Sequence, residues 1–311
     1  MGSCARIIFV TQHYPPDPTT TATYLAAIAG ALATDMEVLV ISGTPGSATE
    51  GSPHVVEIAR WKTRGGALVS RALAMVLFAV RAFWATLVNA RRGDVVFTLT
   101  SPFTLPYSVI LAARLRGAAR ALLIYDLYPE AIEMSGLARR NGIATRTMRL
   151  ANGALFRKLD AIITIGRDVK PLLLAYSGVD KRIIHFIPNW SLLPVGYRPP
   201  MADNPYRPKG FTGLVVGLSG NLGYTHSAET VLRAARRLAD HPNVHFLLSG
   251  WGVGWKALDE AISADPCRNV TLVPPVPEGE LTAFLSAADL WVIPYRRGVA
   301  GVSVPSRLYN L

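Results

Sequence analysis

Cysteine is nearly absent from this chain of 311 residues: only Cys4 and Cys267 occur, far apart in the sequence. Two distant cysteines supply neither the disulfide framework of a small secreted domain nor the ligand set of a zinc site. This usage is typical of a reducing compartment, so we expect a cytoplasmic protein.

An uninterrupted apolar stretch of the length that a membrane span needs, roughly 18–20 residues, is also missing. The first residues, MGSCARIIFVTQHYPP, have an apolar core of only Ile7 to Val10, so we expect no secretory signal there. The loop after the first expected strand lacks the pattern G-x-G-x-x-G, which counts against NAD or FAD binding.

The stretch 67–90 is the most apolar, but Arg71 and Arg81 interrupt it and two further arginines follow it. We expect it to be too short and too often charged to span a bilayer. Two interpretations stay open. It is either a helix packed in the core or a cationic amphipathic helix lying in a membrane interface, with its arginines reaching the headgroups.

Acidic residues are outnumbered, 21 against 32 basic ones, which gives a formal charge of +11. The excess is uneven: residues 1–190 carry +9 and residues 191–311 carry +2. A basic half is drawn to anionic partners such as a phospholipid surface or a phosphorylated substrate. Because no nucleic-acid motif or interleaving of aromatic and basic residues is present, we expect no nucleic acid partner.

Strand and helix patterns alternate through both halves of the chain, and the length favours two domains. Between the halves, residues 191–210 contain five prolines and no periodicity, which predicts a linker. We therefore predict an α/β fold of two Rossmann-like, doubly wound domains facing a cleft, with the domains at 1–190 and 211–311. The second series has only four strands and stops within a helix-like stretch, so we expect this domain to be partial and the chain to be a fragment of a longer protein.

Residues 214–229, LVVGLSGNLGYTHSAE, are a candidate anion site. A strand leads into a glycine-rich loop, and a helix is expected to start near Ser227. Backbone N–H groups and the positive end of the helix converge at such a turn, and glycines let a phosphate approach the backbone. Taken alone, the pattern fits a tight turn without a ligand equally well.

Six stretches in order along nearly the whole chain resemble retaining glycosyltransferases of the GT-B fold, family 4, and within it the enzymes of exopolysaccharide and colanic-acid-type assembly. They are HYPPD at 13–17, DLYPE at 126–130, IPNW at 187–190, GNLGYTHSAETVL at 220–232, AADLWVIPY at 287–295 and GVSVPSRLYNL at 301–311. The resemblance implies an acceptor-binding first domain and a second domain that binds a nucleotide-diphosphate sugar. It implies a lipid-linked or polysaccharide acceptor of the cell envelope, and no cofactor and no metal.

The resemblance also implies site residues. The donor-binding candidates are Gly220, Asn221, Gly223, Tyr224, His226, Ser303, Pro305, Ser306 and Arg307. The catalytic candidates are Asp126 with Tyr125, beside the reacting sugar. His13 is a further catalytic candidate if it lines the cleft, and is otherwise a loop histidine at the surface. Asp126 is equally well explained as the N-cap of the following helix.

Three departures from the family pattern matter. Asn221 and His226 stand where many members carry an Arg and a Lys, Val302 and Asn310 replace a Glu-x7-Glu pair, and the closing strands and final helix are missing. We therefore expect the negative charge of the diphosphate to be neutralised by the N–H groups of residues 220–224 and by Arg307. Arg296 and Arg297 are further candidates, or else a solvated loop pair.

The resulting hypothesis is a retaining glycosyltransferase that moves a sugar from a nucleotide-sugar donor to an envelope glycolipid or polysaccharide precursor. The basic half and the stretch 67–90 would suit an anionic membrane surface, on the inner face of the plasma membrane. The alternatives are a nucleotide-sugar epimerase of the same fold and a non-catalytic, truncated binding fragment.

Overall fold

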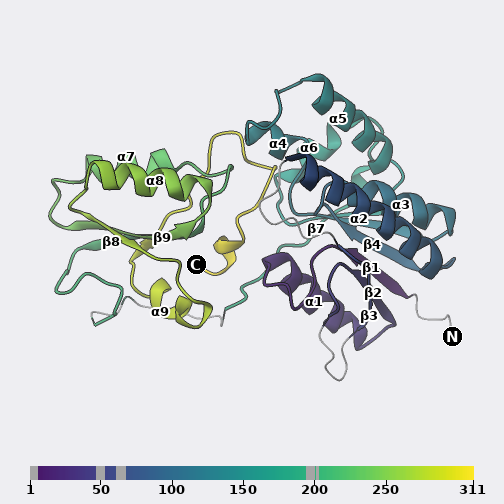
Figure 1. Cartoon of the computed structure of the whole chain (residues 1–311), viewed down its shortest axis with the longest axis horizontal. Helices are drawn as coiled ribbons and strands as arrows, with labels where there is room; N and C mark the ends of the chain where they lie inside the picture. The colour runs from purple at the N-terminus through teal and green to yellow at the C-terminus, as the bar shows by residue number, and fades with distance from the viewer. Residues whose placement is uncertain (1–5, 47–52, 61–67, 194–199, 201–202) are drawn as a thin grey trace. The chain divides into compact units, whose positions relative to one another are not determined.

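The computed structural model describes residues 6–46, 53–60, 68–193, 200 and 203–311. The chain forms two compact units (Figure 1). The first is Met1–Glu133 with Ala138–Pro188 and Gly301–Val304, and the second is Met134–Leu137 with Asn189–Ala300 and Pro305–Leu311. Cys4, the start of the stretch 67–90 and several residues of the expected linker lie outside the described residues.

The first unit contains a parallel seven-stranded sheet in the order β3-β2-β1-β4-β5-β6-β7. Its strands are β1 (Ile7–Thr11), β2 (Val38–Ser42), β3 (His54–Glu57), β4 (Val95–Leu99), β5 (Ala119–Ile124), β6 (Ala161–Thr164) and β7 (Ile184–Phe186). The predicted alternation of strands and helices is present in this half, except that no described helix separates β2 from β3. The direction of winding reverses between β1 and β4, and ligands of such sheets bind outside the carboxyl ends of the strands at that point.

Helices cover both faces of this sheet. α1 (Thr20–Ala33) packs on one face against Phe9, Val40 and Leu123, while α2 (Leu68–Asn89) and α3 (Leu105–Leu115) pack on the other against Ile8 and Val96. Successive strand residues point to opposite faces, so strands covered on both sides are apolar throughout. The remaining helices of the unit are α4 (Glu130–Met134), α5 (Ile143–Phe156), α6 (Val169–Leu174) and the 3-10 turn η1 (Lys181–Ile183).

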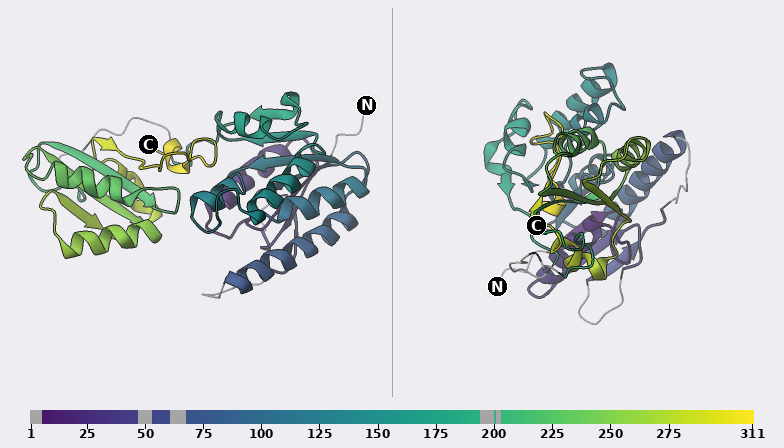
Figure 2. Two further views of the ribbon diagram at one scale, coloured as in Figure 1. Left: turned by 90° about the horizontal axis from the view of Figure 1, so that it is seen from above. Right: turned by 90° about the vertical axis from the view of Figure 1, so that its left-hand side faces the viewer.

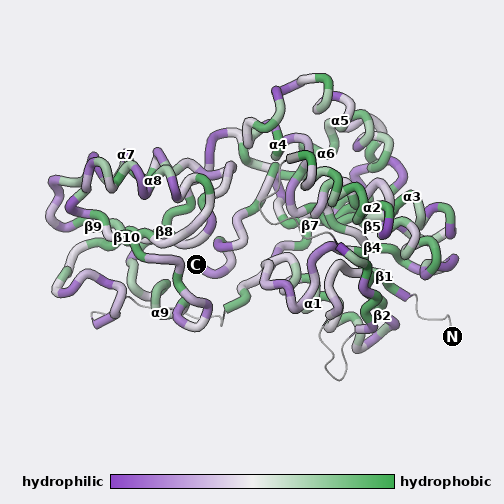
Figure 3. Tube along the Cα trace, in the orientation of Figure 1, coloured by the Kyte–Doolittle hydropathy of each residue, from purple (hydrophilic) through white to green (hydrophobic). Residues whose placement is uncertain are grey.

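We expected the stretch 67–90 to be too short and too often charged to cross a membrane. By length and composition, that expectation is wrong. The helix α2 has 22 residues, and its window Ala72–Asn89 is long and apolar enough to cross a membrane. Only 22% of that window is buried. Arg81 is the one charged residue of that window. Figure 3 shows the apolar character of α2, and Figure 2 shows it running along the outside of the first unit.

The second unit contains a parallel sheet in the order β10-β9-β8-β11. Its strands are β8 (Leu214–Asn221), β9 (Val244–Trp251), β10 (Val270–Val273) and β11 (Leu290–Trp291). α7 (Ala228–Arg237) and α8 (Val253–Ala264) cover one face. The other face is covered by α9 (Leu281–Leu285), which follows the 3-10 turn η2 (Glu278–Glu280).

The described end of the expected linker packs on this second unit. The side-chain amide of Asn204 donates to the carbonyl of Ala283 at 2.7 Å, and the ring of Tyr206 meets Phe284 edge to face at 5.3 Å. Arg207 forms an ion pair with Asp289 at 3.0 Å.

Residues 301–304, here called the return segment, belong to the first unit although they follow the whole second sheet. The backbone N–H of Leu127 donates to the carbonyl of Val302 at 2.8 Å, and Asp126 and Ser303 form an isolated antiparallel bridge. The N–H of Gly301 donates to Oδ2 of Asp168 at 2.6 Å. After this segment the chain rejoins the second unit and ends in the 3-10 turn η3 (Ser306–Tyr309), where the sequence predicted the first turns of a helix.

Candidate functional site

The loop after β1 is held at the carboxyl ends of β1 and β2. The hydroxyl of Thr11 accepts the N–H of His13 at 3.2 Å and donates to the carbonyl of the same residue at 3.0 Å. From the segment after β2, the Thr44 hydroxyl donates to the carbonyl of Tyr14 at 2.6 Å. These bonds hold the backbone of His13 at the switch point of the sheet.

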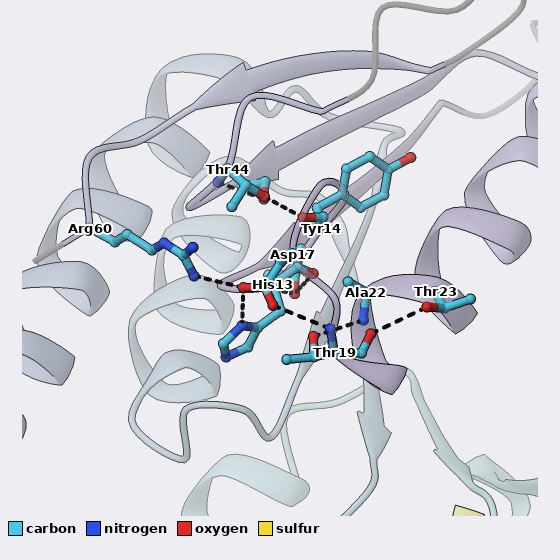
Figure 4. Close-up of polar contacts among 10 residues, drawn as sticks. His13, Tyr14, Asp17, Thr19, Ala22, Thr23, Thr44 and Arg60 are labelled. Carbon is cyan, nitrogen blue, oxygen red and sulfur yellow. Dashed lines mark hydrogen bonds and ion pairs between the residues drawn. The ribbon is translucent and has the colours of Figure 1, made fainter. Parts of the chain in front are cut away.

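The side chain of His13 is held by a carboxylate (Figure 4). Nδ1 of His13 lies 2.9 Å from Oδ2 of Asp17, and Nη1 of Arg60 lies 2.8 Å from the same oxygen. Burial by itself raises the pKa of Asp17, but the hydrogen bonds from His13 and Arg60 outweigh it and hold that pKa below its ordinary value. An ionised Asp17 favours a proton on Nδ1 and leaves the lone pair of the neutral ring on Nε2, for which the described residues offer no partner.

Asp17 and Arg60 were not among the predicted site residues. The signal for Asp17 was in the sequence, because it ends the HYPPD motif four residues after His13. Arg60 follows β3, and no local pattern links it to the first loop.

Asp126 and Tyr125 follow β5. The carboxylate of Asp126 is hydrogen bonded to Ser303 of the return segment; burial raises its pKa, and the bond from Ser303 opposes that shift. The phenol oxygen of Tyr125 is buried without a hydrogen-bond partner among the described residues, and burial raises its pKa.

The glycine-rich loop begins inside β8, which extends to Asn221. Gly220 has a φ of +96°, which favours glycine, and the guanidinium carbon of Arg307 would lie 3.5 Å from a Cβ placed there. Nη2 of Arg307 donates to the carbonyl of Asn221. The loop and Arg307 therefore form one surface.

The backbone of this loop is only partly available to a ligand. The N–H of Leu222 donates to the carbonyl of Trp251 at 2.8 Å, so the expectation that all N–H groups of residues 220–224 face the diphosphate is wrong for Leu222. For the N–H groups of Gly223 and Tyr224, no acceptor is found within the described part of the chain.

His226 closes the loop. Its side chain is buried, and Nδ1 lies 3.1 Å from the hydroxyl of Thr225. Burial, and then the charge of Arg307, lower the pKa of His226 to about 4, so the ring is neutral at pH 7. His226 stands where many members of the family carry a lysine, and it therefore supplies no positive charge.

The segment after β11 supports His226. The rings of His226 and Tyr295 meet edge to face at 4.8 Å, and the N–H of Ser227 donates to the carbonyl of Pro294 at 2.7 Å. Nε of Arg296 donates to the carbonyl of His226 at 3.0 Å, and Arg296 and Arg297 are both exposed. The exposure fits the solvated loop pair, and Arg296 in addition supports the backbone of the loop.

Two buried nitrogens of this site have no hydrogen-bond partner among the described residues: Nη1 of Arg307 and Nε2 of His226. Buried polar atoms are nearly always hydrogen bonded, so these nitrogens are suited to the oxygens of an anion. If the Thr225 hydroxyl donates to Nδ1, the proton of the neutral ring is on Nε2, which then becomes a donor.

The predicted site residues divide between the units. Gly220, Asn221, His226 and Arg307 lie together in the second unit, with Gly223 and Tyr224 in the same loop. Pro305 and the exposed Ser306 lead into Arg307. Ser303 is separate from them, because its partner is Asp126 in the first unit.

Comparison with known proteins gives the family. The profile of the glycosyl transferase 4-like domain matches residues 19–190. The probable glycosyltransferase WbjE of Pseudomonas aeruginosa is 27% identical over 313 residues, covering 98% of this chain and 78% of that protein. The putative colanic acid biosynthesis glycosyl transferase WcaI of Escherichia coli K12 is 26% identical over 275 residues, covering 84% of this chain and 66% of that protein.

A solved structure shares the fold. The structure of Anabaena HepE in complex with UDP matches with a TM-score of 0.59 at 14% identity, covering 92% of this chain and 73% of that one, and HepE has also been solved with UDP-glucose. At this identity the likeness concerns the fold alone. With its two parallel sheets of the GT-B type and its matching domain, the chain belongs to the glycosyl transferase 4-like family of glycosyltransferases.

Proposed function

We propose that the protein transfers a sugar from a nucleotide-diphosphate donor to a lipid-linked or polysaccharide precursor of the cell envelope, with retention at the anomeric carbon. One observation supports the binding of the donor in the second unit. Arg307 and His226 each have a buried nitrogen without a hydrogen-bond partner among the described residues, next to the loop at Gly220. The family supports the reaction class, and the name of WcaI supports the envelope acceptor. The complexes of HepE with UDP and UDP-glucose support a donor of this kind.

The donor site has to meet the charge that builds on the departing diphosphate. When the bond between the anomeric carbon and the phosphate oxygen breaks, the electron pair stays on that oxygen. Arg307, the N–H groups of Gly223 and Tyr224 and the neutral His226 are the groups that we assign to it. One donor fixed in a site that excludes water is worth roughly 3–4 kcal/mol of barrier. We propose that these groups act without a metal ion or a cofactor.

On the acceptor side, we assign the proton-accepting role to His13. Retention requires the acceptor hydroxyl to form its bond to the anomeric carbon on the face from which the diphosphate leaves, and we propose that its proton passes to Nε2 of His13, whose Nδ1 is held by Asp17. Asp126 is less suited because its carboxylate is already bound to Ser303, and Tyr125 because its phenol is buried with a raised pKa.

Titration calorimetry tests the donor site. The full chain is titrated with UDP, GDP and their glucose and mannose derivatives, and we expect heat with one nucleotide series. Arg307→Met should lose most of that binding. Absence of heat with every nucleotide overturns the proposal.

Transfer is tested separately, with a labelled nucleotide sugar and a bacterial lipid extract as acceptor. NMR coupling at the anomeric proton of the product reports retention or inversion. Nucleotide binding without transfer would favour the non-catalytic alternative, and a change of the donor's own sugar would favour the epimerase.

A further inference from the structure

The outer face of α2 is apolar along almost its whole length. Six large side chains are between 49% and 78% exposed: Val69, Leu73, Val76, Val80, Trp84 and Val88. Their spacing of three or four residues puts them on one stripe of the helix. The opposite side is the buried one, where Phe78, Ala82 and Thr86 pack against the first unit.

α3 extends this surface. It packs alongside α2 and exposes Leu111 and Leu115. We call the six side chains of α2 and these two leucines the apolar face. Isolated exposed apolar residues are common on soluble proteins, but a continuous stripe of this length marks a binding surface.

The charged residues of α2, α3 and the chain between them are almost all basic. Residues 68–118 contain six Arg but only one acidic residue, Asp94. Asp94 is buried and forms an ion pair with Arg6 at 2.7 Å, so it does not offset the basic side chains at the surface.

Four exposed arginines gather where α2 and α3 end: Arg91, Arg92, Arg114 and Arg116. The two helix ends are adjacent, because Nε of Arg116 donates to the carbonyl of Ala90 at 2.8 Å. Arg81 lies at the edge of the stripe and is also exposed. The apolar face thus has a cationic border.

We propose that the apolar face is a docking surface for an anionic phospholipid bilayer, with α2 lying in the plane of the interface. The valines, leucines and Trp84 enter the boundary between headgroups and acyl chains, and the arginines bind the anionic headgroups. The binding of this surface to lipid does not depend on the proposed function. Its role in bringing the protein to a lipid-linked acceptor does rest on that function.

Two other occupants fit less well. A second copy meeting the same face would bring two cationic borders together, and neither α2 nor α3 carries an acidic residue to pair them. A membrane-spanning α2 would have to leave the core, exposing the side of the sheet that Phe78 and Ala82 now cover.

The proposal is tested by co-sedimentation of the full chain with sucrose-loaded vesicles of phosphatidylcholine, with and without 30% phosphatidylglycerol (roughly the anionic share that attracts basic segments). We expect binding to the anionic vesicles that weakens in high salt and little binding to pure phosphatidylcholine. The double variant Val80→Asp with Trp84→Asp should reduce binding at least about tenfold, because it puts two charges into the apolar stripe. Leu150→Asp, at a more exposed leucine on α5, should bind like the parent chain.

The cationic border is tested by replacing Arg91, Arg92 and Arg114 with Gln. Each basic residue contributes about 1 kcal/mol near an anionic surface, so the triple variant should bind about 100-fold more weakly. Circular dichroism and urea unfolding show whether each variant is folded.

Three outcomes overturn the docking surface: no binding of the parent chain, equal binding of the double Asp variant, or a dimer in solution that this variant makes monomeric. Resistance to alkaline carbonate extraction would instead indicate a membrane-spanning helix, and would also overturn it. Vesicle binding without nucleotide binding leaves the docking surface standing and counts against the proposed function, so the two can fail separately.

Discussion

Oδ2 of Asp17 accepts hydrogen bonds from both Nδ1 of His13 and Nη1 of Arg60, at 2.9 and 2.8 Å. One carboxylate oxygen therefore links the loop after β1 to Arg60, in the segment after β3. Since Oδ1 of Asp17 also accepts the N–H of Thr19, the N-cap of α1, the aspartate fixes the histidine and the start of the helix together.

Asp17→Asn tests the link to His13. The amide can donate to Nδ1, which moves the ring proton to Nε2 and blocks proton acceptance. We expect kcat for sugar transfer to fall by roughly 100- to 10,000-fold, because the aspartate sets the tautomer of the proton-accepting histidine, with little change in the Kd for the nucleotide.

Imidazole rescue separates this positioning role from a general loss of structure. Transfer by His13→Ala should recover with added imidazole, whereas transfer by Asp17→Asn should not. Asp203→Asn, which removes an exposed carboxylate in the second unit, is the matched control. A loss of nucleotide affinity equal to the loss of kcat would contradict the assignment.

Arg307→Met removes the guanidinium beside Gly220. A hydrogen bond to a charged group contributes about 1.5–3 kcal/mol, so the Kd for UDP should rise roughly 10- to 100-fold. Arg233→Met is the matched control, because Arg233 is an exposed cation of the same unit whose partner is Glu229 on α7. Equal effects of both variants would mean that only net charge matters.

His226 predicts a pH-dependent stability. Its pKa is lowered from 6.5 to about 4 on folding, so the unfolded chain binds the extra proton first as the pH falls. The contribution is fully present above pH 6.5 and is lost toward pH 4, to a total of about 3 kcal/mol. Urea unfolding across this range should be less pH-dependent in His226→Gln and unchanged in His241→Gln, an exposed histidine of the same unit.

Gly250→Ala tests the close approach of β9 to the donor loop. A Cβ at Gly250 would overlap the carbonyl oxygen of Gly220, whereas one at Gly279 would meet nothing within 4 Å. We expect Gly250→Ala to lose about 1–3 kcal/mol of unfolding free energy and to bind UDP more weakly. Gly279→Ala should keep both properties.

The fold was largely readable from the sequence, because buried parallel strands are short apolar runs between turn residues. The runs at 6–11 and 36–42 contain β1 and β2, and the expected helix start near Ser227 is the N-cap of α7. The role of α2 could not be decided in this way. Its composition fits both a core helix and an interfacial one, and the structure gives it one buried and one exposed side.

The site was less readable, because its contacts join distant parts of the chain. The pairing of Asp126 with Ser303 and of Asp17 with Arg60 leaves no periodic signal in the sequence. The N–H of Leu222 looked available from the glycine pattern, but β9 continues far enough to accept it. The clefts and roles assigned from the family resemblance stay predictions.

The return segment has a consequence for how the protein is made. Residues 1–190 leave the ribosome long before Gly301, so the first unit spends the synthesis of the whole second sheet without its last piece. During that time Asp126 lacks Ser303, Asp168 lacks the N–H of Gly301, and the N–H of Leu127 lacks its acceptor. The first unit therefore begins folding first but stays incomplete until the second sheet has been made, and chains released before Gly301 lack the closing contact beside Asp126.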